Sequence, residues 1–131
     1  MMKEIPSADA WLQEAKTMAQ AGEIGMYLLH NGVVRETAKG RVRAQEPNTR
    51  PVIAMEFSHD REQVETVVAE TRKLPGIKHV RVWLNEGRLG VGEDLMYVLI
   101  GGDIRPHVTG ALDFLVGRLK TQCVTEREIY G

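Results

Sequence analysis

The chain has 131 residues, which is the length of one ordinary domain and is enough for a buried core. Its 17 Lys and Arg and 18 Asp and Glu give a net charge of −1, so no overall attraction to nucleic acid or anionic lipid is expected. The single cysteine, Cys123, excludes an internal disulfide framework, and no segment reaches the roughly 20 apolar residues of a membrane-spanning helix. We therefore predict one cytoplasmic domain over residues 1–131, in which any positive site is local.

The first half of the sequence alternates helical and strand-like patterns that are separated by glycine and proline. Ser7 can cap a helix whose apolar residues recur at helical spacing. Asp60, followed by Gln63, has the arrangement of a helix capping box. The predicted elements of this half are a helix from Ser7 to Gly22, a strand at 24–29 that is interrupted at Asn31-Gly32 and resumes at 33–34, a mobile loop at 36–50, a strand at 52–57, and a helix from Asp60 to Pro75.

The second half predicts strands followed by a long final helix. Residues 79–84 alternate apolar and polar side chains, which is typical of a strand with one buried face, whereas residues 95–100 are unbroken apolar and predict a central strand. The glycine-rich turn at 85–93 is short enough to join these two strands as antiparallel neighbours, with room for an extra bent strand. The last helix has an apolar stripe from Val108 to Leu119.

Lys120 lies near the end of this last helix, beside the apolar stripe, where a lysine can be half buried. With Arg127 and Arg35 nearby, its positive charge would be poorly stabilised, which favours work as a nucleophile or in acid–base chemistry. The alternative is a solvated lysine that complements the negative end of the helix dipole. The spacing alone favours this alternative.

Arg105 stands at the start of the same helix, where a cation is unfavourable beside the positive end of the dipole. A phosphate held jointly by the helix N-terminus and the guanidinium would compensate it, and an ion pair with Asp103 is an equally good explanation. Lys120 lies 15 residues further on, roughly 22 Å along a straight helix, so the two cations cannot share one small ligand within one chain. A twofold dimer could bring them together.

Four short motifs occur in a defined order along the chain. They are Gly32-Val33-Val34-Arg35, Ala54-Met55-Glu56-Phe57, Gly87-Arg88-Leu89-Gly90-Val91-Gly92-Glu93 and Leu119-Lys120-Thr121. In the large, catalytic subunit of molybdopterin synthase the corresponding motifs are Gly-x-Val-Arg, a Leu-Glu-Tyr-like strand, Gly-x-Leu-x-Val-Gly-Glu and Leu-Lys-Thr. The chain therefore resembles this family over most of its length.

The resemblance implies an α+β, hammerhead-type fold with a mostly antiparallel sheet and three helices. It also implies a homodimer with a small ubiquitin-like sulfur-carrier subunit at each end, which together form a heterotetramer. The carrier's C-terminal Gly-Gly thiocarboxylate would donate sulfur to cyclic pyranopterin monophosphate, a phosphorylated pterin, and form the dithiolene of molybdopterin. No cofactor or metal is implied, and the four histidines show no metal-ligand spacing.

The resemblance also assigns roles to individual residues. Lys120 and Arg127 take the places of the catalytic lysines. Arg35 and Arg105 would bind the substrate, with Arg105 contributed across the dimer, and Val116 would line the same pocket.

The chain departs from the family pattern at several positions. Ile104 stands where the family usually has histidine, Arg127 where it has a second lysine, and His30 where it has an aromatic residue. Isoleucine carries no proton and arginine is not an ordinary base, so the first two changes remove proton-transfer capacity. The alternative function is therefore a non-catalytic dimeric binding module for a carrier tail or a phosphorylated metabolite.

Overall fold

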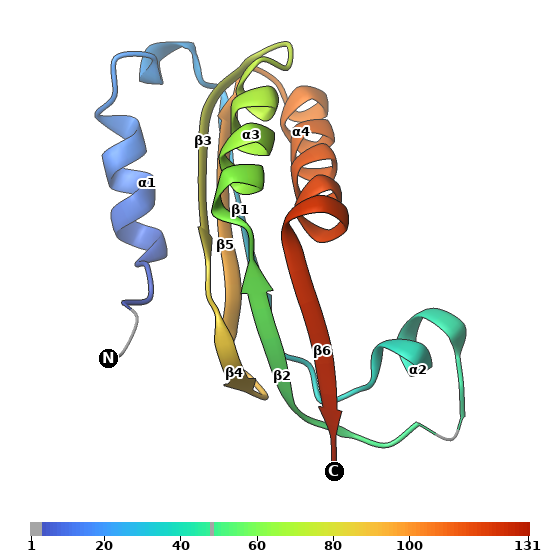
Figure 1. Cartoon of the computed structure of the whole chain (residues 1–131). Coiled ribbons are helices and arrows are strands. Elements are labelled where there is room, and N and C mark those ends of the chain that lie inside the picture. Colours follow the sequence, from blue (N-terminus) through green and yellow to red (C-terminus); the bar gives the residue numbers. More distant parts are fainter. Residues whose placement is uncertain (1–3, 48) are drawn as a thin grey trace.

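A computed structural model describes residues 4–47 and 49–131 of the chain. These residues form two three-stranded antiparallel sheets and four α-helices (Figure 1). The α+β class and the antiparallel pairing are as predicted, but the prediction of three helices is wrong.

The first sheet has the strand order β1-β5-β3. β5 (Asp94–Gly102) lies between β1 (Met26–Val33) and β3 (Ile77–Leu84), and pairs with both in antiparallel register. Its unbroken apolar run is buried on both faces, with Val98 and Leu99 at 0 % exposure. The prediction that the apolar run forms a central strand is confirmed, because only such a position covers both faces.

The predicted interruption of β1 at Asn31-Gly32 is wrong. The strand continues through both residues, and only its register shifts, between Gly32 and Val33. The Asn31 side-chain amide donates to the Met96 carbonyl oxygen (3.1 Å) and to Asp94 Oδ1 (3.0 Å). A residue pair that is typical of a turn is therefore held in a strand by bonds to the neighbouring strand.

The second sheet has the order β4-β2-β6. β2 (Val52–His59) lies between β4 (Gly87–Gly90) and β6 (Val124–Tyr130). β4 is the extra bent strand of the glycine-rich turn. β6 was not predicted, because its alternation of charged and apolar residues is incomplete.

Helices cover both faces of the first sheet (Figure 1). α3 (Arg61–Arg72) and α4 (Arg105–Arg118) pack on one face and share the main hydrophobic core with both sheets. α1 (Ala8–Lys16) packs on the other face through Trp11 and Ala15. Ser7 and Asp60 are confirmed as cap residues, since Ser7 accepts the N–H of Ala10 and Asp60 accepts the N–H groups of Glu62 and Gln63. The predicted capping box is not completed, because the Asp60 N–H donates to the carbonyl oxygen of Cys123.

Two further corrections concern short helices. α1 ends at Lys16 rather than near Gly22, and a 3₁₀ turn, η1 (Ala21–Glu23), follows it. The 36–50 segment, expected as a loop, contains α2 (Lys39–Ala44). No side chain at the α2 N-cap bonds its first turn; instead the Glu128 carboxylate of β6 accepts the Lys39 N–H at 3.0 Å. This helix depends on a contact 89 residues away, which no local pattern indicates.

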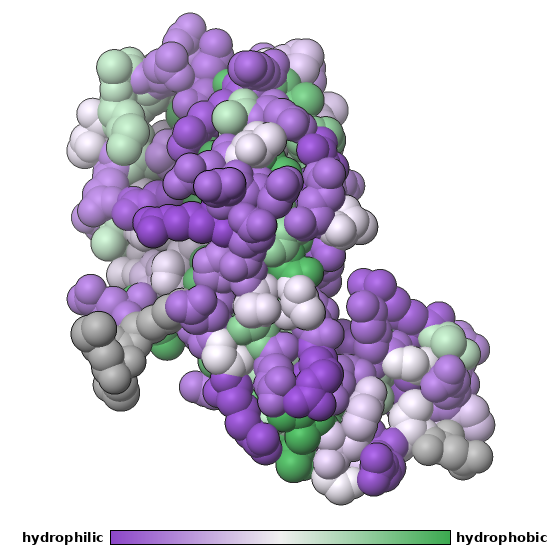
Figure 2. All heavy atoms as spheres, in the orientation of Figure 1, coloured by the Kyte–Doolittle hydropathy of each residue, from purple (hydrophilic) through white to green (hydrophobic). Residues whose placement is uncertain are grey.

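On the face shown in Figure 2, hydrophilic residues dominate and apolar residues appear only in small patches. Within the described part of the chain, no helix combines the length and the apolar character needed to cross a bilayer.

Candidate functional site

The path of α4 sets the positions of the predicted site residues. β5 ends at Gly102, opposite Met26 at the start of β1, and α4 begins three residues later. From there the helix runs back over the sheet, with Val108 and Leu115 fully buried beneath it. The N-terminal end of α4 therefore lies at the start of β1, and its C-terminal end lies toward the end of β1 (Figure 1).

At the C-terminal end, α4 passes into a π-helical turn, η2 (Leu119–Cys123), before β6 begins. Leu119 and Cys123 are buried, whereas Lys120 between them is exposed rather than half buried. Val116, one turn before Lys120, packs partly buried against the main core. Single π-helical turns are frequent at functional sites, because the wider turn changes the direction of one side chain.

The side chain that Lys120 acts on electrostatically is His30 of β1, which the sequence reasoning did not include in the site. His30 is half buried, and its pKa is lowered first by burial and then by the positive charge of Lys120. The signal that could have found it is the alternation of β1, which places His30 on the same face as Met26 and Leu28, toward the helices.

Arg35 follows β1 at the same end of the sheet. The preceding residue, Val34, is buried and fixed by the bond from its N–H to the Glu93 carbonyl oxygen (3.0 Å). The Arg35 side chain is exposed, and its Nε–H donates to the carbonyl oxygen of Thr37 at 2.8 Å. Its guanidinium forms no ion pair with any described residue, so it is available to an anion.

Arg127 is held elsewhere. It lies opposite Glu56 in the β2–β6 register and donates to both carboxylate oxygens, at 2.7 and 3.2 Å. The bond with Glu56 raises the pKa of Arg127, and the same bond lowers the pKa of Glu56. Both line a recess of about 570 Å³ on the second sheet together with Arg88. Among the described residues, Arg127 makes no bond to Lys120, although the sequence placed the two together.

The N-terminal end of α4 carries a different arrangement. The Asp103 carboxylate accepts the Ile104 N–H at 2.7 Å and lies 2.7 Å from His107 Nδ1. The bond with His107 is the main reason that the pKa of Asp103 is lowered. Arg105 is exposed and forms no ion pair within residues 4–47 and 49–131. The ion pair with Asp103 that the sequence offered as an alternative is not formed, because Asp103 is bonded to His107.

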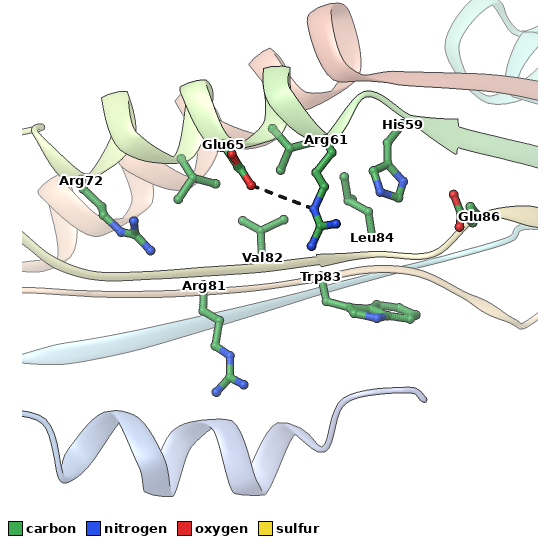
Figure 3. Close-up of a pocket in the computed structure, with 11 residues that line it drawn as sticks. His59, Arg61, Glu65, Arg72, Arg81, Val82, Trp83, Leu84 and Glu86 are labelled. Carbon is green, nitrogen blue, oxygen red and sulfur yellow. Dashed lines mark ion pairs between the residues drawn. The ribbon is translucent and has the colours of Figure 1, made fainter. Parts of the chain in front are cut away.

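Another recess, of about 680 Å³, lies between α3 and β3 (Figure 3). Arg61 and Glu65 form a long ion pair at its edge (4.0 Å), and the Arg81 guanidinium turns away toward α1, 4.5 Å from the centre of the Trp11 ring. Neither Lys120 nor any other predicted site residue lines it.

Cys123 is buried, and burial is the main reason that the pKa of its thiol is raised. A neutral, enclosed thiol is a poor nucleophile, so the packing interpretation of this residue is the better one. Among the described residues, no group of three or more His, Cys, Asp or Glu side chains is arranged to hold a metal ion.

A family model described as "MoaE protein" matches residues 5–122. The chain belongs to the MoaE family. This membership supports a role in molybdenum cofactor biosynthesis, and an enzymatic one. No curated protein sequence matches the chain.

Three solved structures show how far the MoaE fold is shared. Molybdopterin synthase from Staphylococcus aureus is 16 % identical with a TM-score of 0.73, covering 96 % of this chain and 86 % of its own. The molybdopterin biosynthesis MoaE protein from Burkholderia ambifaria MC40-6 is 22 % identical (TM-score 0.69, 97 % and 84 % covered). The complex of subunits 1 and 2 of molybdopterin-converting factor from Helicobacter pylori 26695 gives 16 % identity (TM-score 0.63, 94 % and 80 % covered).

Proposed function

We propose that the protein transfers sulfur from the thiocarboxylated C-terminus of a ubiquitin-like carrier to cyclic pyranopterin monophosphate, which forms the molybdopterin dithiolene. The family match over residues 5–122 carries the proposal. The exposed Lys120 at the junction of α4 and β6 supports it, because this ammonium group makes no ion pair with any described residue. An unpaired cation at a fixed turn suits an anionic thiocarboxylate.

The proposed roles follow the two ends of α4. Lys120 stabilises the negative charge of the thiocarboxylate and of the reacting centre, with Val116 packed beneath it. Arg35, at the same end, binds the phosphate of the pterin. Arg105 lies at the opposite end of α4, so it reaches this site only from a second copy of the chain. The proposal therefore includes a homodimer in which each site is completed by the partner subunit.

The proposed macromolecular partner is a small ubiquitin-like subunit that ends in Gly-Gly, two per dimer. The Helicobacter pylori complex, whose two subunits are named as parts of molybdopterin-converting factor, supports this assembly. The Gly-Gly tail of such a subunit could enter a narrow pocket, because glycine has no side chain. The cytoplasm is the compartment that we propose for this reaction, as the single, buried cysteine is compatible with it.

Reconstitution tests the proposal. The purified chain is mixed with a thiocarboxylated carrier and the pyranopterin precursor, and the product is quantified. We expect Lys120→Ala to lower the rate by 10²-fold or more, roughly the loss seen when one charge-stabilising group is removed. Lys73→Ala is the matched control, since Lys73 is an exposed lysine at the C-cap of α3, and it should leave the rate unchanged. No product from the unchanged chain would reject sulfur transfer.

One observation favours the second candidate function, a non-catalytic binding module. Arg127, in the place of the second catalytic lysine, is bonded to Glu56 and is not free for the reaction. The same reconstitution separates the two functions: carrier binding measured by calorimetry without any product formation would establish the binding module.

A further inference from the structure

The alternation of β1 divides its side chains between two environments. Met26 and Leu28 pack against the main core beneath α3 and α4, whereas Tyr27 and Leu29 pack in the cluster beneath α1. His30 continues the first set, because side chains two residues apart share one face of a strand. Its imidazole therefore lies on the α4 side of the sheet and is half buried there.

The direction of α4 brings Lys120 to this histidine. The helix starts three residues after Gly102, which pairs with Met26 at the beginning of β1, and it runs back along the sheet in the direction of the other end of β1. A Cβ at Gly32 would lie 3.9 Å from His30 Nε2, so the ring lies alongside a residue with no side chain to cover it. The positive charge that acts on the imidazole belongs to Lys120 of the π-helical turn, which follows the C-terminal end of α4.

We propose that His30 is the proton-accepting residue of the Lys120 site, acting when water cleaves the bond between the carrier and the transferred sulfur. This rests on the proposed function, because sulfur delivered from an acyl thiocarboxylate to a pterin carbon is at first still bonded to the acyl carbon. The water oxygen bonds to that carbon, and the acyl carbon–sulfur bond breaks with its electron pair left on the sulfur. The proton of the water goes to His30, and the carrier leaves as a carboxylic acid.

The surroundings suit a neutral base. The facing charge comes from Lys120 on η2, while the adjacent residues of β1 and β5 are the uncharged Leu28, Gly32 and Val98. Burial, and after it the Lys120 ammonium group, lower the pKa of His30 below its ordinary value of 6.5. The imidazole is then uncharged at neutral pH and able to accept a proton, and it loses this ability as the pH falls through its lowered pKa.

The first test is the pH profile of sulfur transfer in the reconstituted reaction. The unchanged chain should lose activity on the acid side, below pH 6.5. His30→Gln should be about 10²-fold slower at neutral pH, a typical loss for a general base, and should lack this acid limb. His79→Gln is the control, because His79 is also half buried with a lowered pKa but lies in edge-to-face contact with Tyr27, on the α1 face. It should keep both rate and profile.

The outcomes separate this proposal from the proposed function. No product from the unchanged chain at any pH would reject sulfur transfer itself. Product from His30→Gln with an unaltered acid limb would reject only the role of His30, since a structural role would change the rate without moving the limb.

A second measurement tests the placement of His30 without any reaction. The ring proton resonances of His30 are titrated by NMR in the unchanged chain and in Lys120→Gln. Removing the neighbouring positive charge should raise the pKa of His30 and leave that of His79 unchanged, because the charges acting on His79 belong to Arg81 and Arg72. An unchanged His30 pKa would overturn the juxtaposition and the proposal with it.

Discussion

The two ends of α4 each present an exposed cation, but they are built in different ways. At the N-terminal end, Asp103 bonds the Ile104 N–H and His107, so the first turn is fixed by residues within four positions of one another. At the C-terminal end, Leu119 and Cys123 are buried in the main core on either side of Lys120. The backbone there is held by residues that are distant in the sequence.

That distant support comes from α3. The N–H of Asp60, the cap residue of α3, donates to the carbonyl oxygen of Cys123 at 2.8 Å. The direction of Lys120 therefore depends on the packing of two helices and a strand, whereas that of Arg105 depends mainly on its own turn. The proposed site would combine Arg105 of one subunit, which is positioned by its own turn, with Lys120 of the other subunit, which is positioned by the packing of the core.

The largest expected effect is at the C-terminal end. Leu119→Ala should lower the free energy of unfolding by about 2–5 kcal/mol, because the Leu119 side chain is 0 % exposed and its removal leaves a cavity in the core. Leu112→Ala, in the same helix but only partly buried, is the control and should cost less. Urea unfolding followed by circular dichroism measures both. If the two losses were equal, the C-terminal end of α4 would not be fixed by the core.

The same contrast explains which elements the sequence predicts. The caps Ser7 and Asp60 act within three residues, and the apolar run of β5 identifies a central strand, so these were predictable. α2 was not, since its cap is the Glu128 carboxylate of a distant strand. Continuity of β1 through Asn31 was missed for the same reason, as its amide bonds across to β5.

In the candidate site, too, the local features could be predicted from the sequence and the features that depend on distant contacts could not. The position of Lys120 came from a motif, and its separation from Arg105 came from helix geometry, but the exposure of Lys120 and the engagement of Arg127 by Glu56 depend on tertiary packing. His30 is the clearest case. Strand alternation alone gives its face, but the effect of the Lys120 charge on its pKa depends on the path of α4.

A smaller effect is expected at the N-terminal end, where the loop before β3 touches α4. Gly76 has a φ of +77°, and a Cβ there would collide with Asp103 Oδ1 and His107 Nδ1. Gly76→Ala should therefore lower the free energy of unfolding by about 1–3 kcal/mol, which is typical when a residue with a side chain is held in the left-handed backbone region. Gly22→Ala, with nothing within 4 Å of its Cβ, is the control and should be nearly neutral. Equal stability of the two variants would show that the Asp103–His107 pair moves without cost.

The smallest effect concerns the ion pair itself and appears only as a dependence on pH. The bond with His107 lowers the pKa of Asp103 below its ordinary value of 3.8. A lowered pKa in the folded state means that the carboxylate stabilises the fold above pH 3.8 and that this contribution is lost as the pH falls through the folded-state value. Asp103→Asn should therefore be less stable than the unchanged chain at pH 6, and the difference should shrink below about pH 4.

Unfolding curves of the two chains between pH 3 and pH 6 give this difference directly. It should be modest, because both side chains are about 40 % exposed (38 % for His107 and 41 % for Asp103) and water screens the pair. Asn still accepts the Ile104 N–H, so the substitution isolates the charge from the cap. A difference that is constant across this pH range would show that the first turn of α4 is fixed by the cap alone, and that His107 contributes nothing to the position of Arg105.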